Sequence, residues 1–340
     1  MGESEKQLEN DEERNMATIK DIAARAGVTA TTVSRVINNR GYISEETRKK
    51  VTQAMQEMNY QPNELARSLA KAHSNTIGVI VPHISHPFFS KMISALESAA
   101  AKRGYKILLC NSKDQPEKET EYLDMFISNR VTGVVMASRD VQIEKFHDLK
   151  IPIVNFEREE NTEAITIQCD NEQGGALAAS HLADCGCRHL LHFGGVAGKD
   201  MPADRRADGF LRVCRERGIE GEVLLSDRLS YGSMHYESYI EKGLLEHPET
   251  DGIFASSDLI AAQVLQCLYA MGKRVPEDIK VVGFDDTVIA GITTPSITTI
   301  HQPIEEMSEL SIAYIDRRRK GEMVPNVTTM PVSLVVRDSA

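Results

Sequence analysis

The sequence has no long apolar run and none of the short motifs that mark common catalytic sites. No run of roughly eighteen apolar residues occurs, so a membrane-spanning helix is not expected. Residues 1–15 contain no apolar segment of the kind found in a secretory signal peptide. There is no glycine-rich phosphate loop, nucleophile elbow or metal-binding helix motif. These absences argue against a membrane protein, a secreted protein and an enzyme. They favour a cytoplasmic protein without a cofactor.

Cysteine is sparse and poorly spaced for metal binding. Of the six cysteines only Cys185 and Cys187 form a close pair. No second pair and no nearby His-x-x-His completes a set of zinc ligands. We therefore expect reduced, mostly buried thiols and no metal site.

Charge is abundant but unevenly distributed. The net charge of −11 divides into −4 for residues 1–15, +4 for residues 16–72 and −11 for residues 73–340. Residues 1–15 also lack apolar periodicity, so we expect a disordered tail. The basic segment is the candidate for contact with nucleic acid, and the acidic remainder argues against a protein that coats nucleic acid generally.

Residues 18–39 have the pattern of two short helices around a tight turn. Thr18 and Asp21 have the spacing of a capping box, and Gly27 can adopt the positive φ that ends a helix. Thr29 is the expected N-cap of the second helix, and Ser44 that of a third. The apolar residues at helical spacing are Ile19, Ile22, Ala23, Ala26, Val33, Val36, Ile37, Val51, Ala54, Met55 and Met58. This pattern predicts a small three-helix core.

The second of these helices leaves a polar face for contact with DNA. Its polar residues are Thr31, Thr32, Ser34, Arg35 and Asn38. In a helix-turn-helix the second helix enters the major groove. The alternative is an ordinary three-helix bundle with a solvated polar face.

A short amphipathic segment follows this bundle. Pro62 lies near the start of an expected helix, and Leu65 and Leu69 share one of its faces. So short a helix is not stable alone, so it needs a partner. The alternative is a simple linker.

The helix-turn-helix and the YQPN sequence at Tyr60–Asn63 together resemble the LacI/GalR family of bacterial transcription regulators, over residues 16–338. The resemblance implies a homodimer on a near-palindromic operator, with hinge helices that fold on the DNA and a Leu69 side chain inserted in the minor groove. It places Ala30, Thr31 and Arg35 at base edges. The full set of implied DNA contacts is Thr18, Thr29, Ala30, Thr31, Thr32, Ser34, Arg35, Asn38, Tyr60, Asn63, Ala66 and Leu69.

From Thr76 onward, apolar runs typical of buried strands alternate with helical stretches. The expected helices are 88–103, 117–129, 172–185, 205–217 and 259–271. This alternation predicts an α/β fold with parallel sheets covered on both faces. About 265 residues suggest two such sheets. The resemblance implies the two-lobed periplasmic-binding-protein arrangement, with crossovers near residues 171, 301 and 331.

These patterns divide the chain into four parts. They are a tail at 1–15, a helix-turn-helix domain at 16–60, a hinge at 61–73 and an effector-binding and dimerisation core at 74–340. Within the core we expect lobe 1 at about 74–171 and 302–330, and lobe 2 at about 172–301 and 331–340.

Polar residues follow several predicted strands, at the ends where open α/β sheets bind ligands. Carboxylates and guanidinium groups opposite an aromatic ring suit a sugar. The resemblance places Phe88, Arg206, Ser257 or Asp258, Asp285 and Gln302 at the effector cleft. His86 and Glu157, which follow predicted strands, are further candidates. Asp258 starts an expected helix, so a purely capping role is the alternative. No obvious pair of aromatic residues is present to hold a purine between two rings.

The sequence therefore predicts a repressor of a carbohydrate-utilisation operon that a sugar effector relieves. CDNEQGGALAASHL and RRADGF look most like sucrose- or other glycoside-responsive members of the family. One alternative is a global catabolite-control regulator with a phosphoprotein corepressor, although VIAGITTPSITTI lacks the basic residue expected there. Another is a sugar-binding protein that does not bind DNA. The absence of a leucine heptad before Ala340 favours a dimer over a tetramer.

Overall fold

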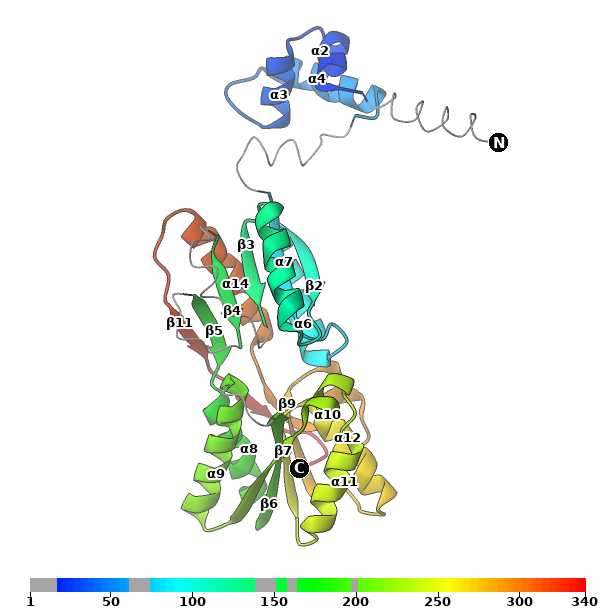
Figure 1. Ribbon diagram of the computed structural model, residues 1–340, viewed down its shortest axis with the longest axis vertical. Helices are drawn as coiled ribbons and strands as arrows, with labels where there is room; N and C mark the ends of the chain where they lie inside the picture. The colour runs from blue at the N-terminus through cyan, green and yellow to red at the C-terminus, as the bar shows by residue number, and fades with distance from the viewer. Residues whose placement is uncertain (1–16, 61–73, 138–150, 158–163, 197–200) are drawn as a thin grey trace, which may run out of the picture. The chain divides into compact units, whose positions relative to one another are not determined.

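The computed structural model describes residues 17–60, 74–137, 151–157, 164–196 and 201–340 (Figure 1). They fall into two compact units that divide between Ser74 and Asn75, and each unit is described by itself. In the described ranges no helix is both long enough and apolar enough to cross a membrane.

The first unit, which we call the head, contains three helices in its described part. They are α2 (Ile19–Ala26), α3 (Ala30–Ile37) and α4 (Glu45–Glu57). Thr18 and Asp21 form the predicted capping box, and Gly27 ends α2 with a φ of 66°. Thr29 and Ser44 cap α3 and α4 as expected.

The core of the head is formed by side chains from all three helices. Its buried members are Ile22, Ala23, Val33, Val36, Val51 and Ala54. Ile19 was expected among them, but this side chain is at the surface with 36% of its area exposed. Ile19 is the first residue of α2, and the buried side chains of this helix are Ile22 and Ala23, about one turn further on.

Lobe 1 of the second unit is built on a parallel sheet of six strands among the described residues. Its strands are β1 (Thr76–Val81), β2 (Lys106–Asn111), β3 (Gly133–Met136), β4 (Ile153–Phe156), β5 (Ile165–Cys169) and β11 (Val327–Met330), in the order β11-β5-β4-β3-β1-β2. Helices α6 (Pro87–Lys102) and α14 (Ile304–Arg319) cover one face, and α7 (Pro116–Ser128) covers the other.

Lobe 2 has a second six-stranded sheet within the described part of the chain. Its strands are β6 (His189–Val196), β7 (Glu220–Ser226), β8 (Gly252–Ala255), β9 (Lys280–Asp285), β10 (Thr298–His301) and β12 (Ser333–Val335), in the order β12-β10-β9-β8-β6-β7. The helices are α8 (Asn171–Asp184), η2 (Pro202–Asp204), α9 (Arg205–Arg217), α10 (Arg228–Ser233), α11 (Glu237–Glu246), α12 (Asp258–Ala270) and α13 (Val288–Ile292). Helices α8 and α9 cover one face, and α11 and α12 cover the other.

The described chain passes between the two sheets in three places. It leaves the first sheet after β5, returns to lobe 1 between β10 and α14, and leaves again between β11 and β12. The predicted α/β class with two parallel sheets is confirmed. One strand departs from it, because β12 pairs antiparallel with β10 at the edge of its sheet.

Candidate functional site

Helix α3 presents a face that is free to contact another molecule. Ala30, Thr31 and Arg35 are exposed on it. The Arg35 side chain makes no hydrogen bond or ion pair with any described residue. Residues four apart on a helix share a face, so Thr31 and Arg35 project together.

Several other predicted DNA contacts also hold the ends of the helices. The Thr18 hydroxyl donates to the Asp21 carboxylate over 2.7 Å. The hydroxyls of Thr29 and Thr32 lie 2.9 Å apart at the start of α3. These side chains are therefore placed by the fold at the edge of the exposed face.

The remaining predicted contacts differ in accessibility. Asn38 donates from Nδ2 to the Ser34 carbonyl over 2.8 Å, so this pair closes the end of α3. Tyr60 is half-buried and packs against the head core. Asn63, Ala66 and Leu69 lie outside the described residues.

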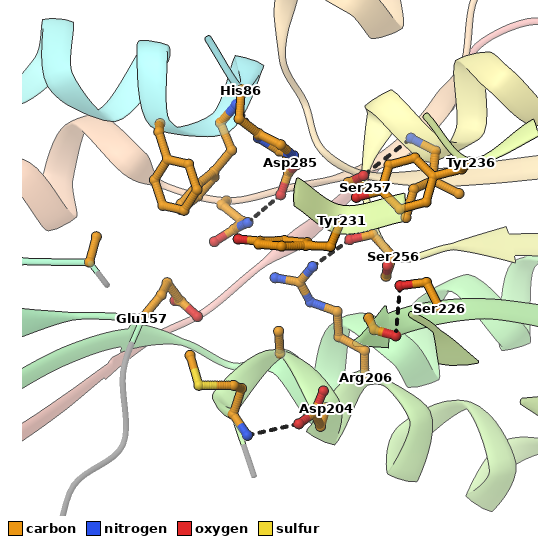
Figure 2. A pocket seen from close by; sticks show the side chains of 18 residues that line it. His86, Glu157, Asp204, Arg206, Ser226, Tyr231, Tyr236, Ser256, Ser257 and Asp285 are labelled. Carbon is orange, nitrogen blue, oxygen red and sulfur yellow. Dashed lines mark hydrogen bonds between the residues drawn. The ribbon is translucent and has the colours of Figure 1, made fainter. Parts of the chain in front are cut away.

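A cavity of about 110 Å³ lies between the two lobes (Figure 2). Of the predicted effector residues, those that line it are Phe88, Arg206, Ser257, Asp285 and Gln302, and the further candidates His86 and Glu157 do so too. Lobe 1 contributes His86, Phe88 and Glu157 from segments after β1 and β4. The cavity thus lies beyond the carboxyl ends of strands of both sheets, as expected for this type of fold.

Asp285 is the most buried acid that faces this cavity. It ends β9 with a φ of 110°, a conformation rare for a residue with a side chain. Only 3% of it is exposed, and burial raises the pKa of its carboxyl well above the ordinary value, opposed by the Arg206 charge. Gln302 donates to Oδ1 over 2.7 Å, while Oδ2 has no hydrogen-bond partner among the described residues. The strained backbone therefore holds a carboxylate oxygen toward the ligand space.

Gln302 is itself fully buried and incompletely satisfied. Its Nε2 is used by Asp285, but its Oε1 has no hydrogen-bond partner among the described residues. An unpaired buried acceptor costs about 1–3 kcal/mol. A ligand hydroxyl at this position would donate to Oε1 and remove that cost.

Arg206 provides donors on the opposite side of the cavity. It is 7% exposed, and its Nε donates to Oδ1 of Asn171 over 2.8 Å while its Nη1 donates to the Ser256 carbonyl over 2.5 Å. Its guanidinium carbon lies 3.5 Å from the ring centroid of Phe284, a cation–π contact. Its Nη2 donates to no described residue. The guanidinium is therefore held in position by the protein and still has N–H groups that can donate to a ligand.

Two glycines explain how α9 brings Arg206 to the cavity. A Cβ on Gly175 of α8 would lie 1.8 Å from the Arg206 carbonyl oxygen, and one on Gly209 of α9 would lie 1.9 Å from the Glu172 carbonyl oxygen. Helices α8 and α9 therefore cross at backbone contact. Any larger side chain at either position forces the helices apart.

Glu157 lies at the margin of the cavity where β4 ends. Its Oε1 accepts a hydrogen bond from the Cys169 backbone, and its Oε2 accepts one from Asn171 Nδ2 over 2.9 Å. Asn171 also accepts from Arg206. The side-chain amide of Asn171 thus links the Glu157 carboxylate to the Arg206 guanidinium.

The expectation that Asp258 contacts the effector is not supported by its geometry. Asp258 is fully buried and does not line the cavity. Its Oδ2 accepts hydrogen bonds from the backbone and hydroxyl of Thr287, and its Oδ1 accepts one from the Thr299 hydroxyl. The carboxylate therefore connects α12 to β10 and to the segment after β9, and the neighbouring Ser257 is the N-cap of α12.

Aromatic residues that the sequence analysis missed also line the cavity. Tyr231 and Tyr236 reach it from the segment around α10 (Figure 2). Phe89 of α6 lines it together with Phe88. The rings of Phe88 and Phe89 lie 5.1 Å apart, edge to face. Phe88 and Phe89 meet edge to face and do not form a parallel pair, so the expectation that no two rings hold a purine between them stays a prediction. The tyrosines follow β7, which ends at Ser226, so the end of that strand was the available signal.

Comparison with known proteins agrees with this architecture. Residues 18–63 match the model for bacterial regulatory proteins of the lacI family, and residues 179–340 match that for a periplasmic binding protein-like domain. The ribose operon repressor of Halalkalibacterium halodurans is 36% identical, covering 95% of this chain and 97% of the relative. The sucrose operon repressor of Streptococcus mutans is 35% identical, covering 95% and 99%.

A solved structure is similar to this chain over most of its length. The lac repressor dimer bound to operator and the anti-inducer ONPF is 25% identical, with a TM-score of 0.83 over 95% of this chain and 99% of that chain. A helix-turn-helix head joined to a two-lobed ligand-binding core defines a ligand-controlled DNA-binding regulator. The chain belongs to the LacI family of bacterial regulatory proteins. It is therefore a transcriptional regulator and not an enzyme.

Proposed function

We propose that this protein represses a carbohydrate-utilisation operon and that a neutral sugar in the interlobe cavity relieves the repression. The observation that carries the proposal is the set of open hydrogen-bonding groups at Asp285, Gln302 and Arg206. Sugar hydroxyls both donate and accept, so they match a carboxylate oxygen, an amide oxygen and a guanidinium. The apolar face of a sugar ring suits the aromatic side chains beside them.

The charges of the cavity favour a neutral sugar over a sugar phosphate. Glu157, Asp204 and Asp285 line it together with Arg206. Two guanidinium donors of Arg206 are already used by the protein. A phosphate would therefore meet more carboxylates than cations, at a cost that burial increases.

The connection between the lobes gives the effector a route to the DNA. The lobes are joined by three chain segments, and Lys91 of lobe 1 donates from Nζ to the Asp286 carbonyl of lobe 2 over 3.1 Å. Asp286 follows Asp285 directly. A sugar that binds one arrangement of the lobes more tightly shifts the population toward it, and we propose that this arrangement is the one that releases DNA.

We further propose the division of the chain that the sequence predicted. Residues 16–60 read DNA, with Arg35 and its neighbours at base edges, and residues 61–73 form the hinge that contains Asn63, Ala66 and Leu69. Two copies bind a near-palindromic operator in the cytoplasm. The relatives named above support a sugar operon as target, and the lac repressor structure supports a dimer.

Thermal unfolding against a panel of compounds tests the effector assignment. The panel holds free pentoses, hexoses and disaccharides, their phosphates, and purine bases. A ligand present at about 100 times its Kd adds about 2.7 kcal/mol to the free energy of unfolding. Stabilisation by a neutral sugar, and release of operator by the same sugar, is the expected result. Stabilisation only by a sugar phosphate or a purine would overturn the effector class, and no response except with a phosphoprotein would favour the catabolite-control alternative.

A further inference from the structure

Lobe 1 has a cluster of exposed cations far from the cavity, at the edge where its parallel strands begin. The cluster comprises Lys102 and Arg103 at the end of α6, and Arg317, Arg318, Arg319 and Lys320 at the end of α14. We call it the basic edge. Each helix runs back from the cavity side of the sheet, so both helices end at this edge (Figure 1).

The end of α6 packs along α14, and Tyr105 beyond it donates to Asp316 near the end of α14 over 2.7 Å. Glu309 of α14 accepts hydrogen bonds from both Lys102 and Arg103 of the α6 end, over 2.6 and 2.7 Å. The guanidinium carbon of Arg319 lies 5.9 Å from the ring centroid of Tyr105, two residues beyond Arg103. The cations therefore lie together and are not scattered over the lobe.

Positive charge is in excess on this surface. The carboxylates in contact with the six cations are Glu309, Asp316 and Glu322 among the described residues. Arg318 is exposed and contacts no carboxylate in the described part of the chain. A cation in the last turn complements the helix dipole, but that effect does not require four in succession. Residues 73–340 as a whole have a net charge of −11, so the basic edge is a positively charged region on an otherwise acidic part of the chain.

The basic edge adjoins the point where the core is tethered to the head. The backbone of Lys106, just after Tyr105, donates to the carbonyl of Asn75, which is the first residue of the core unit. Residues 61–73 connect this point to the head, and a chain of that length spans at most about 45 Å. When the head is bound to DNA, the length of this connection limits the distance between the DNA and the start of lobe 1.

We propose that the basic edge contacts DNA phosphates while the head is bound, so that the core itself contributes to DNA affinity. The proposal rests on the DNA-binding role of the head. Phosphate contacts by arginine and lysine add affinity and salt dependence, but they do not read sequence. The basic edge therefore strengthens binding to operator and to random DNA alike.

The salt dependence of DNA binding by the full-length protein tests the proposal. The probe is a random-sequence duplex of about four helical turns, and fluorescence anisotropy gives the Kd over a series of potassium chloride concentrations. The slope of log K against log salt falls by about 0.9 for each phosphate that the protein no longer neutralises. We expect the slope for R318Q/R319Q to be shallower than that for the unmodified protein. The difference should be about 0.9 or more for each chain bound, which corresponds to at least one lost phosphate contact. R318K/R319K should keep the original slope.

A matched control is available on lobe 2. Arg215 and Arg217 occupy the last turn of α9, as Arg318 and Arg319 occupy that of α14. R215Q/R217Q therefore removes the same charge from an equivalent helix end. Thermal unfolding of each variant verifies that it is folded.

Each outcome of this comparison is decisive. A shallower slope for R318Q/R319Q alone supports the proposal. Equal slopes in all four proteins overturn it, as does an equal decrease in R215Q/R217Q, which would reflect total charge and not position. Unchanged DNA binding with weaker binding to an acidic phosphoserine peptide would make the basic edge a protein-docking surface. If the unmodified protein bound neither operator nor random DNA, the proposed function would fail and not this inference alone.

Discussion

Gln302 donates a hydrogen bond to Oδ1 of Asp285 over 2.7 Å, which joins the end of β9 to the segment that leaves β10 for lobe 1. Asp285 belongs to the sheet of lobe 2, and Gln302 precedes α14 of lobe 1. A ligand that binds Oδ2 of Asp285 therefore contacts a side chain that is hydrogen-bonded to Gln302, in one of the segments that join the lobes. This relationship makes Asp285 the residue through which ligand binding is expected to be sensed.

Asp285→Asn is expected to weaken sugar binding while leaving operator binding intact. The amide keeps the size of the side chain but places an NH₂ group where a carboxyl oxygen was open to the ligand, and a buried polar group left without its partner costs about 1–3 kcal/mol. Sugar affinity measured by calorimetry should fall about tenfold or more. Operator affinity without sugar should stay within about twofold, a difference of less than 1 kcal/mol. Loss of operator binding in a folded variant would give Asp285 a different role.

Asp258→Asn is expected to act on stability instead. The Asp258 carboxylate accepts hydrogen bonds from Thr287 and Thr299 and does not line the cavity. An amide presents N–H groups to these donors, so the free energy of unfolding should fall by about 1–3 kcal/mol. Chemical denaturation measures this change. A variant with normal stability and no sugar response would restore Asp258 as a ligand contact.

Arg35→Ala is expected to relax the choice of base at one position of each half-site. A bidentate contact between arginine and guanine contributes about 1–3 kcal/mol of discrimination. Selection of bound sequences from a random DNA library, with the unmodified protein and the variant in parallel, reports the change. Lys49→Ala, at an exposed position of α4, should leave the selected sequence unchanged. Equal weakening on all sequences in R35A would limit Arg35 to phosphate contact.

Burial of His192 predicts a dependence of stability on pH. Its ring stacks on Phe254 with centroids 4.4 Å apart, and burial lowers its pKa from 6.5 to about 4. Between these values the unfolded chain binds a proton that the folded protein does not, so the free energy of unfolding falls as pH falls. The slope from this group approaches about 1.4 kcal/mol per pH unit. His192→Gln should remove that slope in urea unfolding between pH 6.5 and 5. Identical pH profiles for the two proteins would contradict the assignment.

Gly175→Ala is expected to disturb both stability and sugar binding. The added Cβ would lie 1.8 Å from the Arg206 carbonyl oxygen, so α9 must move and take Arg206 with it. Overpacking of this kind costs about 1–3 kcal/mol or more. Gly232→Ala is the control, because a Cβ there meets no atom within 4 Å. Thermal unfolding and sugar calorimetry on both variants report the two effects. Full sugar affinity in G175A would show that α8 and α9 separate without displacing Arg206.

The local elements of the fold were predictable from the sequence to a large extent. Helix α9 occupies the predicted residues, Arg205–Arg217, and α8 begins at Asn171, one residue before its predicted start. The capping box at Thr18 and Asp21 formed as expected. These features depend on neighbours within a few residues, so a single stretch of sequence contains most of the information. Short elements such as α10, α13 and β12 have weaker periodicity and were not anticipated.

The site was predictable only in part, for a different reason. Asp285 follows an apolar run, and strand ends mark ligand sites, so its place at the cavity could be expected. The end of β7 marks the segment that contains Tyr231 and Tyr236, but it does not single out these two side chains, which reach the cavity through the folding of the segment around α10.

The sequence alone was sufficient to predict the helix-turn-helix, the alternation of strands and helices after Thr76, the basic head with an acidic core, and the family. It did so because capping, apolar periodicity and charge are properties of short segments. The three-dimensional packing was needed to show which of two acids, Asp258 or Asp285, lines the cavity. Asp258 and Asp285 both follow buried strands, yet the first is surrounded by hydrogen-bond donors of its own lobe and the second keeps an oxygen open to the cavity. That distinction depends on contacts between residues far apart in the chain, and only folding brings those residues together.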